Sequence, residues 1–408
     1  MMVSTTKTHW PSLGMLLLSG GGAFLAFMSA AGFAVGGLMT CLKSSTGMED
    51  AQVLFSLAST AFLIFVLLLP STVMAAMRLM GIAIPEWRRT WFFKASRIGM
   101  FLVPIAILFG YLVSSHVGAA TILFPLFQLI VVGLPIWWLI ETGKHDLPPS
   151  SAQHNWGILS ISLTTTMPLI VVVELILVVC IVAGVVFCIS FFSPDVLQQL
   201  STTLDRLVNA GIDRETVLRI IRPYTSKPSV ILLLIAIASG IIPLLEELLK
   251  PLALWFFSNR QLTPREGFIG GMICGAGFAL LESLGALANP SAESWVVIAT
   301  GRVGTGILHI TATGLVGWGL ARAWTDGKYG SLIGAYLAAF CFHSLWNASA
   351  LMTGFRELAQ FAPIQVEVLD GFIQASPFIL VMLAIFMVSV ILRANTIFRK
   401  EQNNLNEF

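Results

Sequence analysis

The sequence predicts an all-α, polytopic integral membrane protein with about ten transmembrane helices. Two properties of the 408-residue chain support this fold class: 56% of its residues are hydrophobic and only 11% are charged. Soluble domains carry about 25% charged residues, so this composition does not supply a water-soluble surface. The apolar residues gather in long runs, not in the alternating strands of about ten residues that build a membrane β-barrel.

The composition also excludes several classes of function. A soluble enzyme and a disordered hub both need far more charged side chains than this chain carries. The net charge of +2 is too small for a nucleic-acid-binding protein that follows phosphates. The 5 cysteines show no CxxC spacing, which disfavours a disulfide framework and a thiolate metal site.

Ten apolar stretches of about 18 residues or more are each long enough to cross a hydrocarbon layer of about 30 Å. In chain order we expect transmembrane helices at 13–40, 53–76, 98–114, 117–140, 165–192, 229–257, 267–288, 295–320, 331–353 and 372–392. The turn between the third and fourth stretches is weakly marked, and the fifth extends back toward Trp156.

Lysine and arginine residues are distributed unevenly over the connecting loops. If the N-terminus is cytoplasmic, the cytoplasmic segments hold fourteen of them and the opposite segments hold seven. Cytoplasmic loops of membrane proteins are enriched in these residues. We therefore expect a multi-pass protein of the plasma or inner membrane with both termini in the cytoplasm.

The segment 193–228 is the only sizeable piece that we expect outside the membrane. A Ser-Pro-Asp helix-start signal begins at Ser193, and apolar residues follow at helical spacing. Gly211 marks a helix stop, and Asp213 is suited to cap a second short helix. We expect an extracytoplasmic cap of two helices that lies on the membrane surface; the alternative is an element that screens substrates.

Ionisable side chains inside the spans are concentrated in four consecutive helices. Such groups cost about 2.5–3.5 kcal/mol each to insert and usually serve a function. In chain order they are Glu246, Glu247 and Lys250; Glu282; Arg302 and His309; and His343, followed by Asn347. Counting residues from the nearest cytoplasmic charge places two carboxylates and two imidazoles about 20–24 Å into the bilayer. We therefore expect Glu246, Glu282, His309 and His343 to meet in one pocket.

The distribution of these side chains divides the chain into three parts. Residues 1–156 form four spans that contain none of them. Residues 157–354 contain the cap and the four polar spans, and we expect them to form the functional core. Residues 355–408 add the last span and a cytoplasmic tail.

The first polar span carries two adjacent carboxylates with different expected roles. Glu246 and Lys250 are four residues apart, in the order that suits a helical ion pair. Glu247 points about 100° away from Glu246, so both cannot face one cavity squarely. We expect one of them to be structural, bonded to the backbone or to Lys250, and favour Glu246 as the chemical group. Pro251 has no N–H for the carbonyl of Glu247, so the helix should kink there.

Three other polar residues have structural interpretations beside the functional ones. Arg302 lies seven residues after Trp295, which favours an ion-pair partner or an interfacial anchor over a catalytic group. Asn347 follows His343 by one helical turn and could take part in chemistry or only bond across helices. Glu174 lies in the fifth span and is equally suited to a hydrogen-bonded helix contact.

The charge count narrows the chemistry of the predicted pocket. Three carboxylates face two cations, which leaves a net charge of −1 when the histidines are neutral. A proton on one carboxylate would balance this charge and create a general acid or base. A divalent metal such as zinc, held by Glu246, Glu282, His309 and His343, would also balance it and would activate water. Both solutions lead to hydrolysis, and a relay for protons or ions is the non-enzymatic alternative.

Motifs in these four spans resemble those of the PrsW family of intramembrane proteases. The matching runs are, in chain order, Glu246–Lys250 (EExxK), Phe278–Glu282 (FxxxE), His309, and His343–Asn347 (HxxxN). The resemblance covers residues 229–354. The wider clan of CAAX and bacteriocin-processing proteases has a histidine where this chain has Glu282, so a glutamic-type and a metal-dependent enzyme both stay open.

The resemblance implies a division of labour among these residues. It implies water activation by Glu246, support from Glu247 through Lys250, water positioning or metal binding by Glu282 and His309, and oxyanion stabilisation by His343 and Asn347. We therefore expect an endopeptidase that cleaves membrane-anchored proteins near the outer part of the lipid bilayer and has no nucleic-acid partner. The rivals are a proton- or ion-coupled transporter and an inactive membrane scaffold. A transporter predicts broken helices in both halves of the chain, whereas the polar residues lie in one half only.

Overall fold

The computed structural model describes residues 9–43, 48–84, 90–192, 194–210, 227–256, 262–288, 294–359 and 367–406, together with Thr216 and Ile220. Within these ranges the regular secondary structure is helical throughout, which confirms the predicted all-α class. Two short π-helical turns, η2 and η3, interrupt the α-helices. The expected helix stop at Gly211 and the cap at Asp213 lie outside the described residues.

The helices follow one another along the chain with short connections. Their bounds are α1 (Trp10–Lys43), α2 (Met48–Leu79), α3 (Thr90–Gly99), α4 (Leu102–Val113), α5 (Val117–Lys144), α6 (Ala152–Ile161), η2 (Ser162–Thr166), α7 (Met167–Phe192), α8 (Pro194–Ala210), α10 (Pro228–Ala236), η3 (Ile237–Ile241), α11 (Ile242–Leu249), α12 (Leu252–Trp255), α13 (Pro264–Ala286), α14 (Trp295–Asp326), α15 (Tyr329–Ala359) and α16 (Glu367–Asn406).

Among the described residues, 9 helical stretches are long and apolar enough to cross a membrane. They coincide with nine of the ten predicted spans, so the chain is a multi-pass membrane protein. The remaining prediction, 331–353, lies in α15, a 31-residue helix whose polar side chains lower its hydropathy. At 1.5 Å per residue this helix is about 46 Å long, which is enough to cross the bilayer. The fifth stretch is continuous over Ala152–Phe192 and thus begins before Trp156.

The chain divides into two compact units. The first contains Met1–Pro168, Glu247–Phe340 and Ala384–Phe408, and the second contains Leu169–Glu246 and Cys341–Leu383. The predicted boundaries after residues 156 and 354 stay predictions.

Helices α13 and α14 form the core of the first unit. Their most apolar windows are 89% and 78% buried, whereas the other candidate spans are 6–33% buried. A stripe of small residues on α13 permits this close packing: a Cβ at Gly275 would collide with the carbonyl oxygen of His309, and one at Gly271 with that of Thr313. These glycines thus bring α13 and the backbone of α14 into direct contact.

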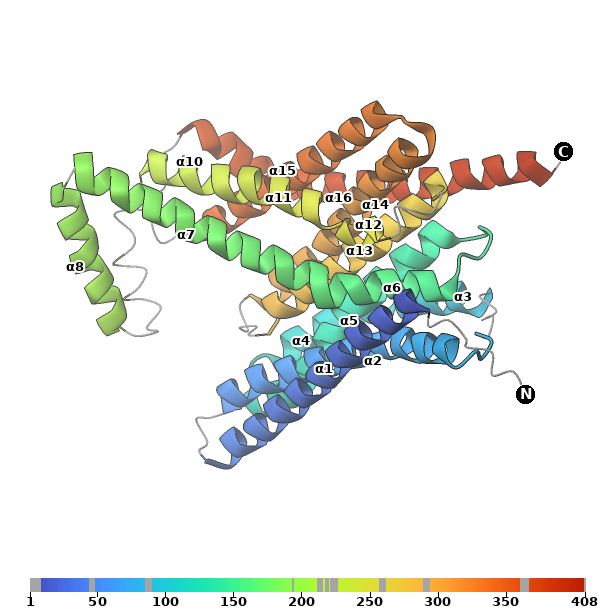
Figure 1. Cartoon of the computed structure of the whole chain (residues 1–408). Coiled ribbons are helices and arrows are strands. Elements are labelled where there is room, and N and C mark those ends of the chain that lie inside the picture. Colours follow the sequence, from blue (N-terminus) through green and yellow to red (C-terminus); the bar gives the residue numbers. More distant parts are fainter. Residues whose placement is uncertain are drawn as a thin grey trace. The chain divides into compact units, whose positions relative to one another are not determined.

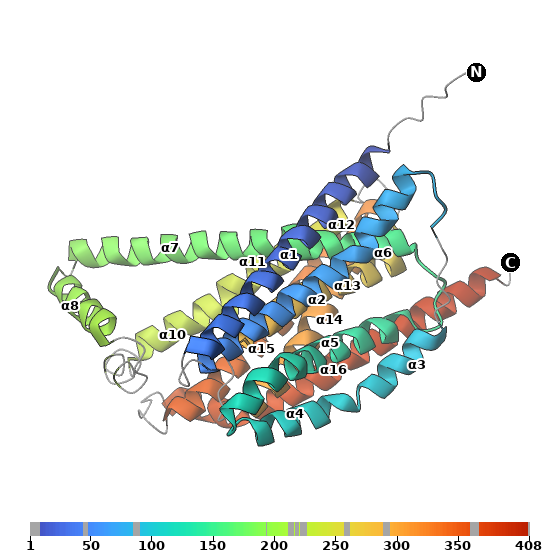
Figure 2. The same ribbon diagram turned by 90° about the horizontal axis from the view of Figure 1, so that it is seen from below.

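Helices α1 and α2 form a long antiparallel pair in the same unit, side by side in both views (Figures 1 and 2). Only 11% of the α1 window is buried, and large apolar side chains such as Phe24, Leu25 and Leu38 are exposed along it. Such a surface suits contact with lipid chains.

The second unit has its own small core. Ile231, Met352, Phe355 and Ile373 pack together there. Thr353 on α15 also hydrogen-bonds Ser376 on α16 at 3.0 Å. Helix α8 follows α7 directly (Figure 1), which agrees with the helix-start signal predicted in this part of the chain.

Candidate active site

A short helical segment, α11, carries the two adjacent glutamates. The π-helical turn η3 precedes it, and Pro251, which cannot donate a backbone hydrogen bond, lies two residues after its last residue, Leu249. The predicted break at Pro251 is therefore present, and α12 starts directly after it. Single π-turns inside helices are frequent at functional sites. The peptide bond between Glu246 and Glu247 is also one of the four points at which the chain passes from one compact unit to the other.

In the first unit, a chain of charged side chains connects the end of α11 to α14 and α13. Lys250 Nζ donates a hydrogen bond to Glu247 Oε1 at 2.7 Å and lies 2.8 Å from His309 Nδ1. His309 Nε2 lies 2.8 Å from Glu282 Oε2. Arg302 Nη1 forms an ion pair with Glu282 Oε1 at 2.9 Å. We call these five residues the Lys250 network.

Burial changes along the Lys250 network. The side chains of Glu247 and Lys250 are 0% exposed, and that of His309 is 2% exposed. Those of Arg302 and Glu282 are 25% and 37% exposed. The network therefore runs from the interior of the unit toward its surface.

Lys250 pairs with Glu247 at i,i+3, which confirms the expectation that one of the two glutamates bonds to Lys250. The i,i+4 spacing alone had suited a pair with Glu246. The physical reason is the helix end: α11 stops at Leu249, so Lys250 no longer follows the side-chain directions of a continuous helix.

Phe278 has a role in this network that sequence reasoning missed. Lys250 Nζ lies 4.2 Å from the centroid of the Phe278 ring, which is within range of a cation–π interaction. The same ring meets His309 edge to face, with centroids 4.8 Å apart. The spacing of Phe278 and Glu282 on α13 was the available signal, because it places both on the face toward α14.

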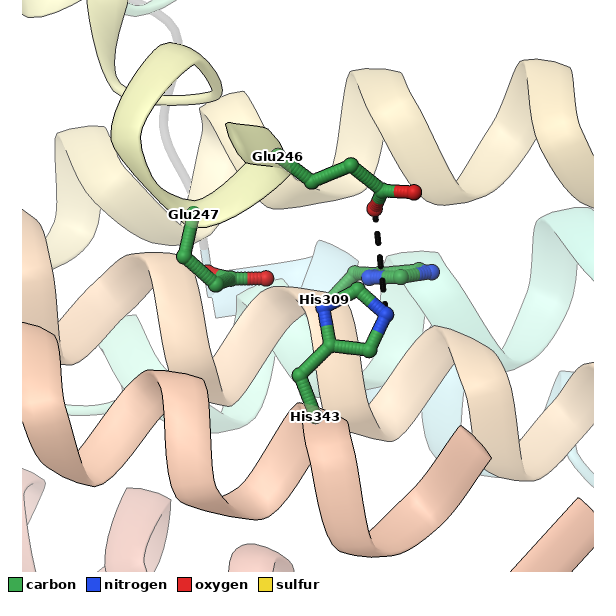
Figure 3. Close-up of side chains that lie close together, drawn as sticks. All are labelled: Glu246, Glu247, His309 and His343. Carbon is green, nitrogen blue, oxygen red and sulfur yellow. Dashed lines mark ion pairs between the residues drawn. The ribbon is translucent and has the colours of Figure 1, made fainter. Parts of the chain in front are cut away.

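In the second unit, Glu246 faces His343. Glu246 Oε2 and His343 Nε2 are 3.7 Å apart, and the residues are 7% and 2% exposed (Figure 3). This separation exceeds an ordinary hydrogen bond of 2.7–3.2 Å.

Asn347 lies one turn beyond His343 on α15. Its Nδ2 donates a hydrogen bond to the carbonyl oxygen of Ala238, inside η3, at 2.9 Å. In a π-turn the backbone N–H does not bond to the carbonyl that it would bond to in an α-helix. Here a side chain from another helix, α15, binds a carbonyl oxygen of that turn. The asparagine thus connects α15 to the turn before α11.

The structure brings the predicted site residues together as two groups, one in each unit. The first contains Glu247, Lys250, Glu282, Arg302 and His309, and the second contains Glu246, His343 and Asn347. Glu174, on α7 of the second unit, belongs to neither group.

Charge is distributed differently over the two groups. Lys250 and Arg302 pair with Glu247 and Glu282, so with a neutral His309 the first group sums to zero. The net charge of −1 counted from the sequence therefore falls on the group that contains Glu246.

Four side chains of these groups are buried and have the donor types that zinc accepts: Glu246, Glu247, His309 and His343 (Figure 3). Glu282, which we had also considered as a ligand, contacts His309 and Arg302.

Comparison with known proteins adds independent support. A family model described as PrsW family intramembrane metalloprotease matches residues 173–391, more than half of the chain. This match extends on both sides beyond the 229–354 region that carries the motifs. No curated protein and no solved structure matches the chain. On the strength of the family match, the chain belongs to the PrsW family of intramembrane metalloproteases.

Proposed function

We propose that this protein is an endopeptidase that hydrolyses peptide bonds of membrane-anchored proteins, and that Glu246 is its general base. The observation that carries the proposal is the pair of Glu246 and His343, two buried groups 3.7 Å apart. The cations of the Lys250 network pair with the other two carboxylates at 2.7–2.9 Å, which suits Glu247 and Glu282 to a structural role and leaves the general-base role with Glu246.

The reaction follows from what these side chains can donate and accept. Glu246 takes a proton from water as the water oxygen attacks the carbonyl carbon of the scissile peptide. The same carboxyl group then gives the proton to the amine nitrogen as the C–N bond breaks. His343 and the second N–H of the Asn347 amide stabilise the oxyanion. The substrate helix must unwind locally, because its own hydrogen bonds shield the peptide bond.

The residues of the second unit also fit the metal that the family description implies. Two atoms that each lie about 2.0–2.1 Å from one zinc ion are at most about 4.2 Å apart, and Glu246 Oε2 and His343 Nε2 satisfy this limit. A divalent ion would balance the charge of −1, and it supplies the Lewis acidity that strengthens water as a nucleophile. This metal-dependent mechanism is the alternative to the one in which Glu246 is the general base: in it, Glu246 and His343 would be among the residues that hold the ion.

Proteoliposomes with a panel of single-span reporter proteins test the proposal. The wild type should cleave at least one reporter, whereas Glu246→Gln and His343→Ala should not, with unchanged membrane insertion. Glu141→Gln, on α5, and His116→Ala, before it, are matched controls that should keep activity. Cleavage by both site variants would contradict the assignment. Failure of the wild type on every reporter would favour an inactive scaffold.

The orientation in the membrane is a further part of the proposal. The bias of fourteen against seven basic residues supports a topology in the plasma or inner membrane with both termini in the cytoplasm. A reporter domain that is active only in the cytoplasm should be active when it is fused to either terminus. A reporter domain that is active only on the opposite side should be inactive at both. A terminus on the opposite side would contradict this topology.

A further inference from the structure

We propose that His309 is a positioning residue and not a metal ligand. It is a neutral imidazole, protonated at Nε2, that connects the Lys250 ammonium group to the Glu282 carboxylate. The Lys250 ammonium group supplies the positive charge that a metal ion would otherwise bring to Glu247 and His309. The inference rests on the proposed function only where it concerns the metal.

The two neighbours of the imidazole determine where its proton lies. A lysine ammonium group has only donors, so His309 Nδ1, 2.8 Å from Lys250 Nζ, accepts and carries no hydrogen. An ionised carboxylate only accepts, so Nε2, 2.8 Å from Glu282 Oε2, donates and carries the hydrogen. One neutral tautomer satisfies both contacts. Arg302 forms an ion pair with the other oxygen of Glu282.

The Lys250 ammonium group occupies the position of a cation among these donors. It contacts a carboxylate oxygen at 2.7 Å, an imidazole nitrogen at 2.8 Å and the face of the Phe278 ring at 4.2 Å, and its side chain is 0% exposed. A carboxylate and an imidazole are also the donors of a zinc site. In this network the cation is part of the chain itself.

A metal at His309 would disturb this arrangement. Histidine ligands usually donate their second ring N–H to a carboxylate, and His309 already does so toward Glu282 through Nε2. Only Nδ1 then has a lone pair, and Lys250 uses it. A metal there would displace a buried ammonium group from its acceptor, which is strongly unfavourable. In a metal-dependent enzyme Glu246 and His343 would contribute to holding the ion, whereas His309 keeps Lys250 and Glu247 in place.

Metal content of the purified full-length protein in detergent tests this assignment. Glutamine has one acceptor oxygen and one amide donor, so it can bridge Lys250 and Glu282 as the neutral histidine does. We expect His309→Gln to keep zinc within twofold of the wild type and to unfold at a higher temperature than His309→Ala. His343→Ala should lose zinc at least tenfold. Equal loss of zinc from His309→Gln and His343→Ala would overturn the proposal.

Nitrogen NMR of histidine-labelled protein with a chelator gives a readout that needs neither metal nor cleavage. The His309 signals are those that disappear in His309→Gln. We expect the neutral Nε2–H tautomer, and a signal from the Nδ1–H tautomer or from imidazolium would overturn the proposal. If the wild type binds no zinc, the metal part of the proposed function fails, while the NMR result still decides the role of His309.

Discussion

In the Lys250 network each carboxylate contacts a cation at 2.7–2.9 Å, whereas in the second unit Glu246 faces the His343 imidazole at 3.7 Å. Both groups of side chains lie on helices of one family domain, and Glu246 and Glu247 are consecutive in the sequence. They nevertheless differ in charge balance and in the closeness of their contacts.

The difference separates structural from chemical polar residues. A buried charge with a close partner of opposite sign is costly to disturb, so the Lys250 network suits a fixed scaffold. A carboxylate in a wider contact can take up a proton, a water molecule or a metal ion with less rearrangement. We infer that the first group positions the segment around α11 and that the second carries out the reaction.

The largest contrast is expected between substitutions of the two adjacent glutamates. Glu246→Gln should lower the cleavage rate by about 10²–10⁴-fold and leave the thermal unfolding midpoint unchanged. Glu247→Gln leaves the buried Lys250 without its anion, so it should destabilise the protein by about 3–5 kcal/mol. Cleavage assays and thermal unfolding in detergent measure the two effects. The opposite pattern would show that the roles of the two glutamates are reversed.

A second contrast concerns Asn347, which should affect the reaction more than the fold. Asn347→Ala removes an oxyanion donor, so the cleavage rate should fall by about 10²–10³-fold. Thr353→Val, which removes a side-chain contact farther along α15, is the control and should keep the rate. If Asn347→Ala lowers only the unfolding midpoint, the asparagine serves solely to bind Ala238.

Much of the fold could be predicted because it depends on regular spacing. The lengths of the apolar runs predicted the spans, and the regular spacing of Gly271 and Gly275 is the pattern that permits the close packing of α13 on α14. The break at Pro251 was predictable from the missing backbone donor alone. Each of these features depends on the sequence of a single helix or on the side chains that lie along one of its faces.

The pairing of the polar residues could not be predicted in the same way. The end of α11 redirects Lys250 toward Glu247, and the contact of Phe278 with Lys250 depends on how two helices meet. The bond from Asn347 to Ala238 requires a π-turn that no simple periodicity announces. Depth along the helices predicted one pocket, which stays a prediction, but depth alone does not say which polar residues bond to one another within each unit.

A third test changes the helix contact that positions His309. A Cβ at Gly275 meets the carbonyl oxygen of His309, so Gly275→Ala should move α14 and cost about 1–3 kcal/mol of stability. Gly285, on the same helix, has no atom within 4 Å of such a Cβ, and Gly285→Ala is the matched control. Thermal unfolding of both variants measures the difference. Equal midpoints would contradict the close contact.

The smallest effect is expected at the exposed end of the Lys250 network. Arg302 and Glu282 are partly exposed, so their ion pair is screened and Arg302→Gln should cost less than about 1 kcal/mol. The cost should also shrink as salt rises, because screening weakens exposed pairs. Thermal unfolding at low and high salt, with Glu247→Gln as the reference, measures both properties. If Arg302→Gln loses as much stability as Glu247→Gln, and salt does not reduce that loss, the whole network behaves as one buried unit. The difference in exposure between its two ends would then have no effect on stability.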